Sequence, residues 1–207
     1  MNSVTFDFNT QTLLQKALPK AMSYVSYREM VAQLAKEGKS TGPEQTDALT
    51  NYTQLNDRRM NRWDKTLKFT PEAEAIIAQY AQQTTWLVLT ESWCGDASPA
   101  IPVIQKIAEL NENITLKIIL RDENIAIMDL FLSNGNRSIP KLIAIDDQTG
   151  DVIGTWGPRS TNATKLVEDY KAQHDSLSAE FKQDLQVWYN NDKGNSILED
   201  LTRLLLK

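Results

Sequence analysis

The stretch WCGDASPAIP, residues 93–102, decides the fold. It follows WLVLTES (86–92), a short run of apolar and β-branched residues that predicts a buried strand. It opens ASPAIPVIQKIAELN (97–111), which predicts a helix in spite of two prolines. Because the N-terminus of a helix stabilises a thiolate, Cys94 in this turn indicates thiol–disulfide chemistry. The chain has no second cysteine, and Ala97 stands three residues further on.

The residues after this turn alternate between strand and helix patterns. We expect strands at ITLKIIL (114–120), KLIAID (141–146) and DVIGTWG (151–157), and helices over 124–135 and from residue 161 onward. Strand–helix–strand–helix order implies parallel pairing, and the last two strands form an antiparallel hairpin. Open sheets of this kind bind ligands at the carboxyl ends of their parallel strands, which is where Cys94 lies.

The first part of the chain is predicted to be helical throughout. One helical region covers residues 1–40, with a break at Pro19 and an end at Gly38. Further helices are predicted over 44–67 and 70–83, and two more over 178–194 and 196–207. We therefore expect a helical N-terminal extension (1–83) packed on an α/β domain (84–207) that ends in a helical segment.

The composition narrows the possible partners. The chain has 207 residues and a net charge of −5, which argues against nucleic acid as a partner. No apolar run approaches the ~18 residues of a membrane helix, and no signal peptide is recognised, so a cytoplasmic location is predicted. One cysteine and His174 alone do not form a zinc site, and no metal or cofactor is implied. The sequence does not predict an oligomeric state.

Residues 84–175 resemble a thioredoxin-fold domain, which implies a central mixed sheet flanked by helices. WCGD stands where that family has its active-site turn, and Pro102 matches the proline that kinks the active-site helix. RSIPK (137–141) matches the family's cis-proline loop, and Gly157 matches a glycine that borders the substrate groove. The whole chain is also similar to bacterial thioredoxin-like proteins with a Trp-Cys-Gly-Asp-Ala turn, a group that brings no secure activity.

The turn itself supplies the central candidate residues. Cys94 is expected to have a pKa below the free value of ~8.5, since it begins a helix. Trp93 is predicted to shield the thiol, with Gly95 and Ala97 completing the turn. Asp96 has two interpretations: a first-turn carboxylate that stabilises the helix, or a charge that raises the thiol pKa and carries a proton or orients a cationic substrate.

Residues outside the turn complete the predicted site. The resemblance implies that Pro140 packs on the thiol and that the backbone of Ile139 pairs with an extended substrate. Arg137 is a candidate for holding a carboxylate of a small thiol, or is a solvated arginine. Glu91 is a candidate replacement for the buried acid of thioredoxins, although an exposed loop acid is favoured.

Two further groups of charged residues each have a binding and a structural interpretation. Arg121 and Asp122 either line the groove of Cys94 or form an ion pair that caps the next helix. Arg58, Arg59, Arg62 and Lys65 form a basic group on the extension. This group can bind an acidic partner if the extension covers the site, and a solvated face is the default interpretation.

These residues lead to three candidate functions. The first is a monothiol oxidoreductase in which Cys94 forms a mixed disulfide that a small external thiol releases; a dithiol mechanism is excluded. The second is a redox-inactive binding module for a peptide or metabolite, and the third is a thiol redox sensor. The expected partners are a low-molecular-weight thiol, a protein disulfide or a peptide.

Overall fold

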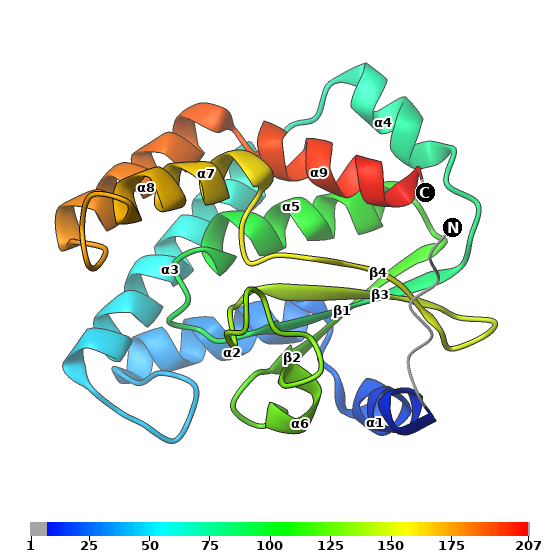
Figure 1. Cartoon of the computed structure of the whole chain (residues 1–207), viewed down its shortest axis with the longest axis horizontal. Helices are drawn as coiled ribbons and strands as arrows, with labels where there is room; N and C mark the ends of the chain where they lie inside the picture. Colours follow the sequence, from blue (N-terminus) through cyan, green and yellow to red (C-terminus); the bar gives the residue numbers. More distant parts are fainter. Residues whose placement is uncertain (1–7, 207) are drawn as a thin grey trace.

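The computed structural model describes residues 8–206 and is built on one sheet of four strands (Figure 1). The strands are β1 (Thr84–Thr90), β2 (Ile114–Leu120), β3 (Lys141–Asp146) and β4 (Val152–Trp156). Their order across the sheet is β2-β1-β3-β4. All residues of β1 are buried, as expected of a central strand rich in apolar residues.

Pairing in the sheet is mixed. β1 and β2 are parallel, as predicted for a strand–helix–strand unit, and β3 and β4 form the predicted antiparallel hairpin. β3, however, runs antiparallel to β1, so the expectation of parallel pairing for this strand was wrong. The reason is that the segment before β3 holds only the short helix α6 (Ile125–Met128) and reverses the chain without a full crossover helix.

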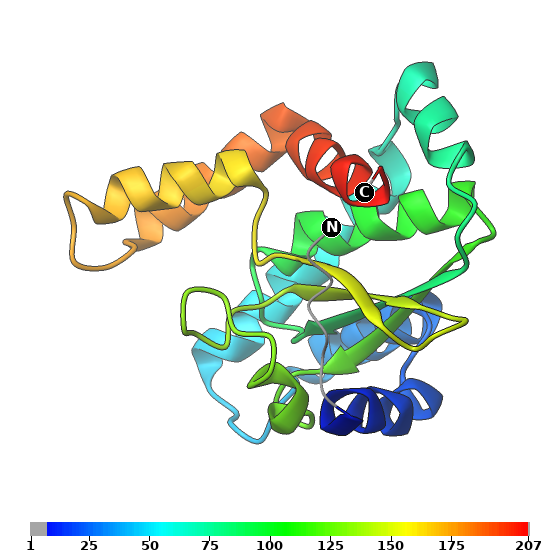
Figure 2. The same ribbon diagram turned by 45° about the vertical axis from the view of Figure 1, so that its right-hand side comes forward.

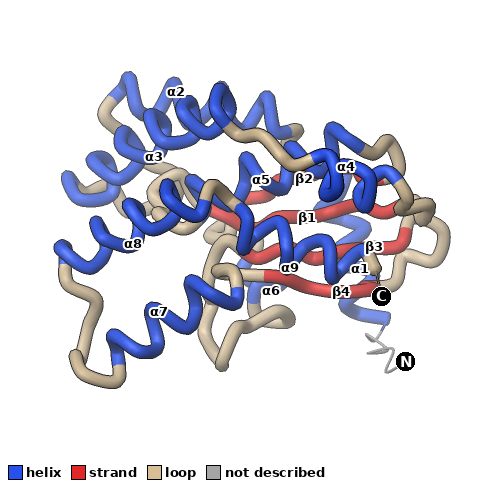
Figure 3. The backbone as a smooth tube through the Cα atoms, turned by 90° about the horizontal axis from the view of Figure 1, so that it is seen from above, coloured by secondary structure: helices blue, strands red, loops and turns tan. Residues whose placement is uncertain are grey.

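Helices cover both faces of the sheet. α5 (Ala97–Leu110) and α9 (Asn195–Leu205) lie on one face, above the sheet in Figure 1. α1 (Phe8–Ala17), α2 (Tyr24–Glu37) and α6 lie on the other face, and α3 (Asp47–Thr66) runs past one end of the sheet (Figures 1 and 3). The apolar side chains of both layers and the sheet form one continuous core, which also contains Cys94.

The N-terminal helices begin and end at local signals. Pro19 falls in the 3-10 turn Leu18–Lys20 that separates α1 from α2, and Gly38 ends α2 in a left-handed conformation. Thr70 caps α4 (Pro71–Ala78), which is shorter than the predicted helix. Residues 1–7 of the first predicted helical region lie outside the described residues.

These helices are joined to the sheet directly. Met22 forms two backbone hydrogen bonds with Ile118 of β2, of 2.8 and 2.9 Å. α3 packs against both α2 and α5. The helical N-terminal part of the chain is thus packed on the α/β part, while the predicted boundary at residue 83 stays a prediction.

The C-terminal helices form an arm beside the sheet. α7 (Thr161–Lys171) and α8 (Ala179–Asp192) extend from the body as an antiparallel pair, which is clearest in Figure 2. The rings of Tyr170 and Phe181 stack with centroids 3.9 Å apart and join the two helices. α8 then leads through Gly194 into α9, which returns over the sheet.

One predicted helix was too long. The structure has helix only at Ile125–Met128 within the predicted range 124–135. The chain then turns, Phe131 is buried in the core, and Ser133 and Asn136 close a small bridge. No helix among residues 8–206 has both the length and the apolar character required to cross a membrane.

Candidate functional site

Cys94 lies where two predicted segments meet. β1 ends at Thr90, and a short loop carries Cys94 to the start of α5, with a backbone hydrogen bond of 3.1 Å from Cys94 N to Glu91 O. The Cys94 thiol donates to the carbonyl oxygen of Ile139, at 3.3 Å from Sγ. The Ile139–Pro140 peptide bond is cis. The structure therefore brings together the turn and the RSIPK loop.

The pKa of the Cys94 thiol is not the one that its position at a helix N-terminus predicts. Cys94 is 7% exposed, and burial raises its pKa to about 12. Asp96 also raises this pKa, whereas the N–H groups of Ala97 and Asp96 and the charge of Arg159 lower it. The prediction of a pKa below ~8.5 was therefore wrong, because burial outweighs the effect of the helix N-terminus.

Asp96 belongs to a half-buried ion pair. Arg159 approaches Asp96 Oδ2 at 2.6 Å, and Tyr189 donates its hydroxyl hydrogen to Oδ1 at 3.1 Å. Burial raises the pKa of Asp96, and the attraction of Arg159 opposes this. Asp96 makes no side-chain capping bond to α5, so its contacts are with Arg159 and Tyr189 and not with the helix N-terminus.

Arg159 and Tyr189 were missed in the sequence. Arg159 follows Gly157 and Pro158 at the end of β4, so the glycine that borders the groove in the family could have directed attention to it. Tyr189 has no such signal, because it lies on α8 and reaches Asp96 across 93 residues of sequence.

Helix α8 covers the turn. Gln186 donates a hydrogen bond of 3.2 Å from Nε2 to the carbonyl oxygen of Gly95. Leu185 of the same helix is buried beside the turn. Between α8, α3 and the turn remains a pocket of about 610 Å³, a size suited to a small molecule. Its lining includes Trp93, Cys94, Gly95, Asp96, Arg121, Arg137 and Ile139.

The two arginines predicted near the groove both line it, and both are ion-paired. Arg121 lies 2.7 Å from Asp122 Oδ1, and its guanidinium is 5.0 Å from the ring centroid of Trp93. Arg137 makes two hydrogen bonds to Asp129, of 2.5 and 2.9 Å. Asp122 pairs with Arg121 but does not itself line the pocket.

Glu91 is a buried acid and not the exposed loop acid that the sequence favoured. Glu91 is fully buried, and its Oε1 accepts a hydrogen bond of 2.8 Å from the Asp122 N–H. Oε2 has no hydrogen-bond partner within residues 8–206. Burial raises the pKa of Glu91, which is the behaviour of a carboxyl removed from water.

Ser92 joins the Cys94 turn to the N-terminal helices, a role that the sequence did not reveal. Its hydroxyl accepts from Thr41 N at 2.9 Å and lies 2.8 Å from Thr53 Oγ1. Asn56 of α3 donates to the carbonyl oxygen of Ser92 at 2.9 Å. The position of the turn is thus fixed by side chains of α3 and of the loop before it.

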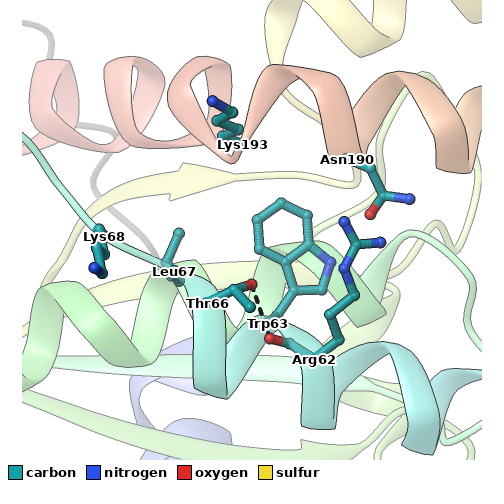
Figure 4. Close-up of a pocket in the computed structure, with 7 residues that line it drawn as sticks. All are labelled: Arg62, Trp63, Thr66, Leu67, Lys68, Asn190 and Lys193. Carbon is teal, nitrogen blue, oxygen red and sulfur yellow. Dashed lines mark hydrogen bonds between the residues drawn. The ribbon is translucent and has the colours of Figure 1, made fainter.

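A second pocket, of about 430 Å³, lies between the C-terminal ends of α3 and α8 (Figure 4). Trp63 stands in its middle, and the side chains of Arg62 and Asn190 point toward each other beside it (Figure 4). The other lining side chains include Lys68 and Lys193, both exposed. This pocket contains no predicted catalytic group, so the pocket at Cys94 is the candidate site.

Comparison with known proteins agrees with this architecture. No curated protein matches the chain. The crystal structure of a protein of unknown function from Pseudomonas aeruginosa is 15% identical, with a TM-score of 0.56, over 89% of this chain and 97% of that one. An HIV epitope-scaffold is also 15% identical, with a TM-score of 0.54, over 89% of this chain and 98% of its own. Both show a shared fold alone.

The family is shown by the sequence. Residues 42–171, more than half of the chain, match a protein-family model described as thioredoxin. The matched range contains β1 to β4, the Cys94 turn and the Ile139–Pro140 loop, and it ends at the last residue of α7. The chain therefore belongs to the thioredoxin family.

Proposed function

We propose that this protein is a monothiol thiol–disulfide oxidoreductase in which Cys94 is the nucleophile and a small external thiol completes the cycle. The observation that carries the proposal is the position of the Cys94 thiol, which lines the pocket and contacts the Ile139 carbonyl oxygen. Ala97 occupies the place of a resolving cysteine and is itself buried. The similarity to bacterial single-cysteine proteins is consistent with this proposal and adds no activity to it.

The proposed cycle has two exchange steps. The Cys94 thiolate attacks one sulfur of a disulfide, so that a Cys94–sulfur bond forms, the original bond between the two sulfurs breaks, and the other half leaves as a thiolate. A low-molecular-weight thiolate then attacks the substrate sulfur of the mixed disulfide, and Cys94 leaves as a thiolate and is reprotonated. The cycle exchanges one thiol for another, and the thiol would come from a reducing compartment such as the cytoplasm.

The thiol proton limits the first step. With a pKa of about 12, Cys94 is almost entirely protonated at neutral pH. Asp96 is the neighbouring carboxylate whose charge opposes thiolate formation, and burial raises its own pKa. We therefore expect slow exchange while α8 covers the turn, and faster exchange in any state that exposes Cys94 to water.

The raised thiol pKa also favours a second candidate, a redox-inactive binding module. In that case the pocket holds a ligand beside a permanently protonated Cys94. A redox sensor needs a thiol that oxidises readily, which the same pKa disfavours. The reactivity of Cys94 separates these candidates.

The test is adduct formation on the intact protein. The protein is incubated at pH 8 with bis(2-hydroxyethyl) disulfide, and its mass is followed with time, with Cys94→Ser as the control. The monothiol proposal expects one adduct that grows with time, is removed by excess 2-mercaptoethanol and does not form in the variant. No adduct on the folded protein, together with ready modification in urea, would favour the binding module.

A further inference from the structure

One arginine of the pocket lacks the partner that the others have. Four arginines line it, and three of them face a carboxylate: Arg121 pairs with Asp122, Arg137 with Asp129 and Arg159 with Asp96. Their charges are already balanced inside the protein.

The fourth arginine, Arg59, has no carboxylate within ion-pair distance anywhere in residues 8–206. It is half-buried on α3, and its one hydrogen bond, of 3.0 Å, goes to Asn56 Oδ1. Burial and the charge of Arg58 lower the pKa of Arg59, in keeping with a guanidinium that has no carboxylate beside it. A half-buried, unbalanced guanidinium is costly unless a ligand supplies the opposite charge.

The side chain of Arg59 is also held in place. Asn56 accepts from Arg59 through Oδ1 and donates through Nδ2 to the carbonyl oxygen of Ser92, two residues before Cys94. One amide therefore connects the guanidinium to the active-site turn. This arrangement orients Arg59 before any ligand arrives, which reduces the entropy lost on binding.

The residues around Arg59 indicate the chemistry of the rest of the ligand. Leu49, Tyr52 and Leu55 of α3 line the same pocket, and Leu177 and Leu185 line it from the side of α8. Leu55 is 38% exposed, so the pocket offers apolar surface as well as charge. A short aliphatic stem that ends in a carboxylate fits both features.

We infer that Arg59 binds a carboxylate of the small disulfide or thiol that reacts at Cys94, so that the site prefers anionic low-molecular-weight disulfides. The inference rests on the proposed function, because it names the substrate class of the same site. A small ligand is favoured over a folded protein, since α8 hydrogen-bonds to the turn and leaves Cys94 only 7% exposed.

The test compares three disulfides with the same two-carbon stem: 3,3′-dithiodipropionate (anionic), bis(2-hydroxyethyl) disulfide (neutral) and cystamine (cationic). The rate of adduct formation on Cys94 is measured by intact mass and divided by the rate of each reagent with N-acetylcysteine. For the unmodified protein, the normalised rate should fall from the anionic to the neutral to the cationic reagent. Arg59→Gln should lower the anionic rate about tenfold and leave the neutral rate unchanged.

Two variants serve as controls. Arg58→Gln removes the neighbouring charge, which is exposed and does not line the pocket, so the three rates should stay as they were. Arg59→Lys keeps the charge and should restore part of the anionic preference. Equal changes with all three reagents in Arg59→Gln, or a charge preference that Arg58→Gln removes equally well, would overturn the inference.

A failure of the proposed function is distinguishable from a failure of this inference. If no disulfide forms an adduct, binding of suberate, a dicarboxylate of the same length without sulfur, is measured by calorimetry on the same proteins. If Arg59→Gln weakens suberate binding about tenfold and Arg58→Gln leaves it unchanged, the pocket binds anionic ligands as inferred, but the proposed thiol chemistry is rejected. Absent or Arg59-independent suberate binding would reject the role of Arg59.

Discussion

Replacing Asp96 by asparagine should make Cys94 more reactive. Asp96 raises the pKa of the thiol, while Arg159 lowers it and is itself paired with Asp96 at 2.6 Å. Asp96→Asn removes the negative charge and leaves the positive charge of Arg159 facing the thiol. Only the contribution that opposes the thiolate is lost, so the pKa of Cys94 should fall from about 12.

The size of the change follows from the interaction of two charges. At an effective dielectric constant of about 20, two unit charges roughly 6–8 Å apart interact with an energy on the order of 2–3 kcal/mol. Because ~1.4 kcal/mol corresponds to one pKa unit, the thiol pKa should fall by roughly 1.5 to 2. Burial remains the larger cause, so the pKa should stay above the free value of ~8.5. At neutral pH the variant should therefore hold roughly 30 to 100 times more thiolate.

The assay is alkylation by iodoacetamide between pH 6 and pH 10, followed by intact mass. In the unmodified protein the rate should increase about tenfold per pH unit without a plateau, because the thiolate fraction stays far below one. In Asp96→Asn the rate at pH 7.5 should be roughly 30 to 100 times higher. Asp169→Asn is the matched control, since it removes an exposed carboxylate on α7 and should leave the rate unchanged.

Two results would refute this reasoning. A plateau between pH 7 and pH 9 in the unmodified protein would show that its thiol pKa is not raised. An unchanged rate in Asp96→Asn would show that Asp96 does not control the thiol. If the variant only loosens the site, the rate should still increase about tenfold per pH unit up to pH 10, whereas a thiol pKa lowered to about 10 makes this increase flatten as the pH approaches 10.

Three further variants test the structure around the site. Gly157→Ala should lower the free energy of unfolding by more than ~2 kcal/mol, because φ is +110° and a Cβ atom would lie 2.2 Å from a backbone carbonyl oxygen. Gly38→Ala is the control: φ is +66° with open space around the Cβ position, so this variant should cost only about 1 kcal/mol. Both free energies are measured by urea unfolding. Ser92→Ala should cost ~2–3 kcal/mol, since it leaves buried donors without an acceptor, against ~1 kcal/mol for Ser98→Ala. Glu91→Gln should gain stability relative to the unmodified protein as the pH rises from 4.5 toward 8. The reason is that the Glu91 carboxyl, whose pKa is raised in the folded protein, stabilises the fold below its ordinary pKa of 4.5 and loses that contribution as it ionises. A difference in urea midpoint between the two proteins that does not change with pH would contradict the burial of the Glu91 charge.

The elements that carry strong local signals were predictable from sequence. β1 and β2 are short apolar runs, the hairpin of β3 and β4 is marked by its turn, and α5 follows the Cys94 turn directly. Local patterns fix each of these, since the residues that form the element also define its ends. Cys94 at the carboxyl end of β1 followed from the same patterns.

Properties that depend on distant segments were not predictable. The thiol pKa was predicted from the start of α5 and the nearby Asp96, but Gln186 and Tyr189 of α8 lie against the turn and help to bury it. Glu91 was assigned to an exposed loop because no local pattern shows that Asp122 N–H meets its carboxylate. In both cases the burial of a titratable group is set by packing across the fold, which its neighbours in sequence do not reveal.

The family does not determine the chemistry of this site. The part of the chain that matches thioredoxin ends at residue 171, before α8 begins at Ala179. Gln186 and Tyr189, which contact Gly95 and Asp96, therefore come from outside the matched region. The thioredoxin frame supplies the position of the cysteine, whereas α8 contributes to its burial and to the state of Asp96. Reactivity known for other members of the family thus has no direct bearing on Cys94, and its pKa has to be measured on this chain with α8 in place.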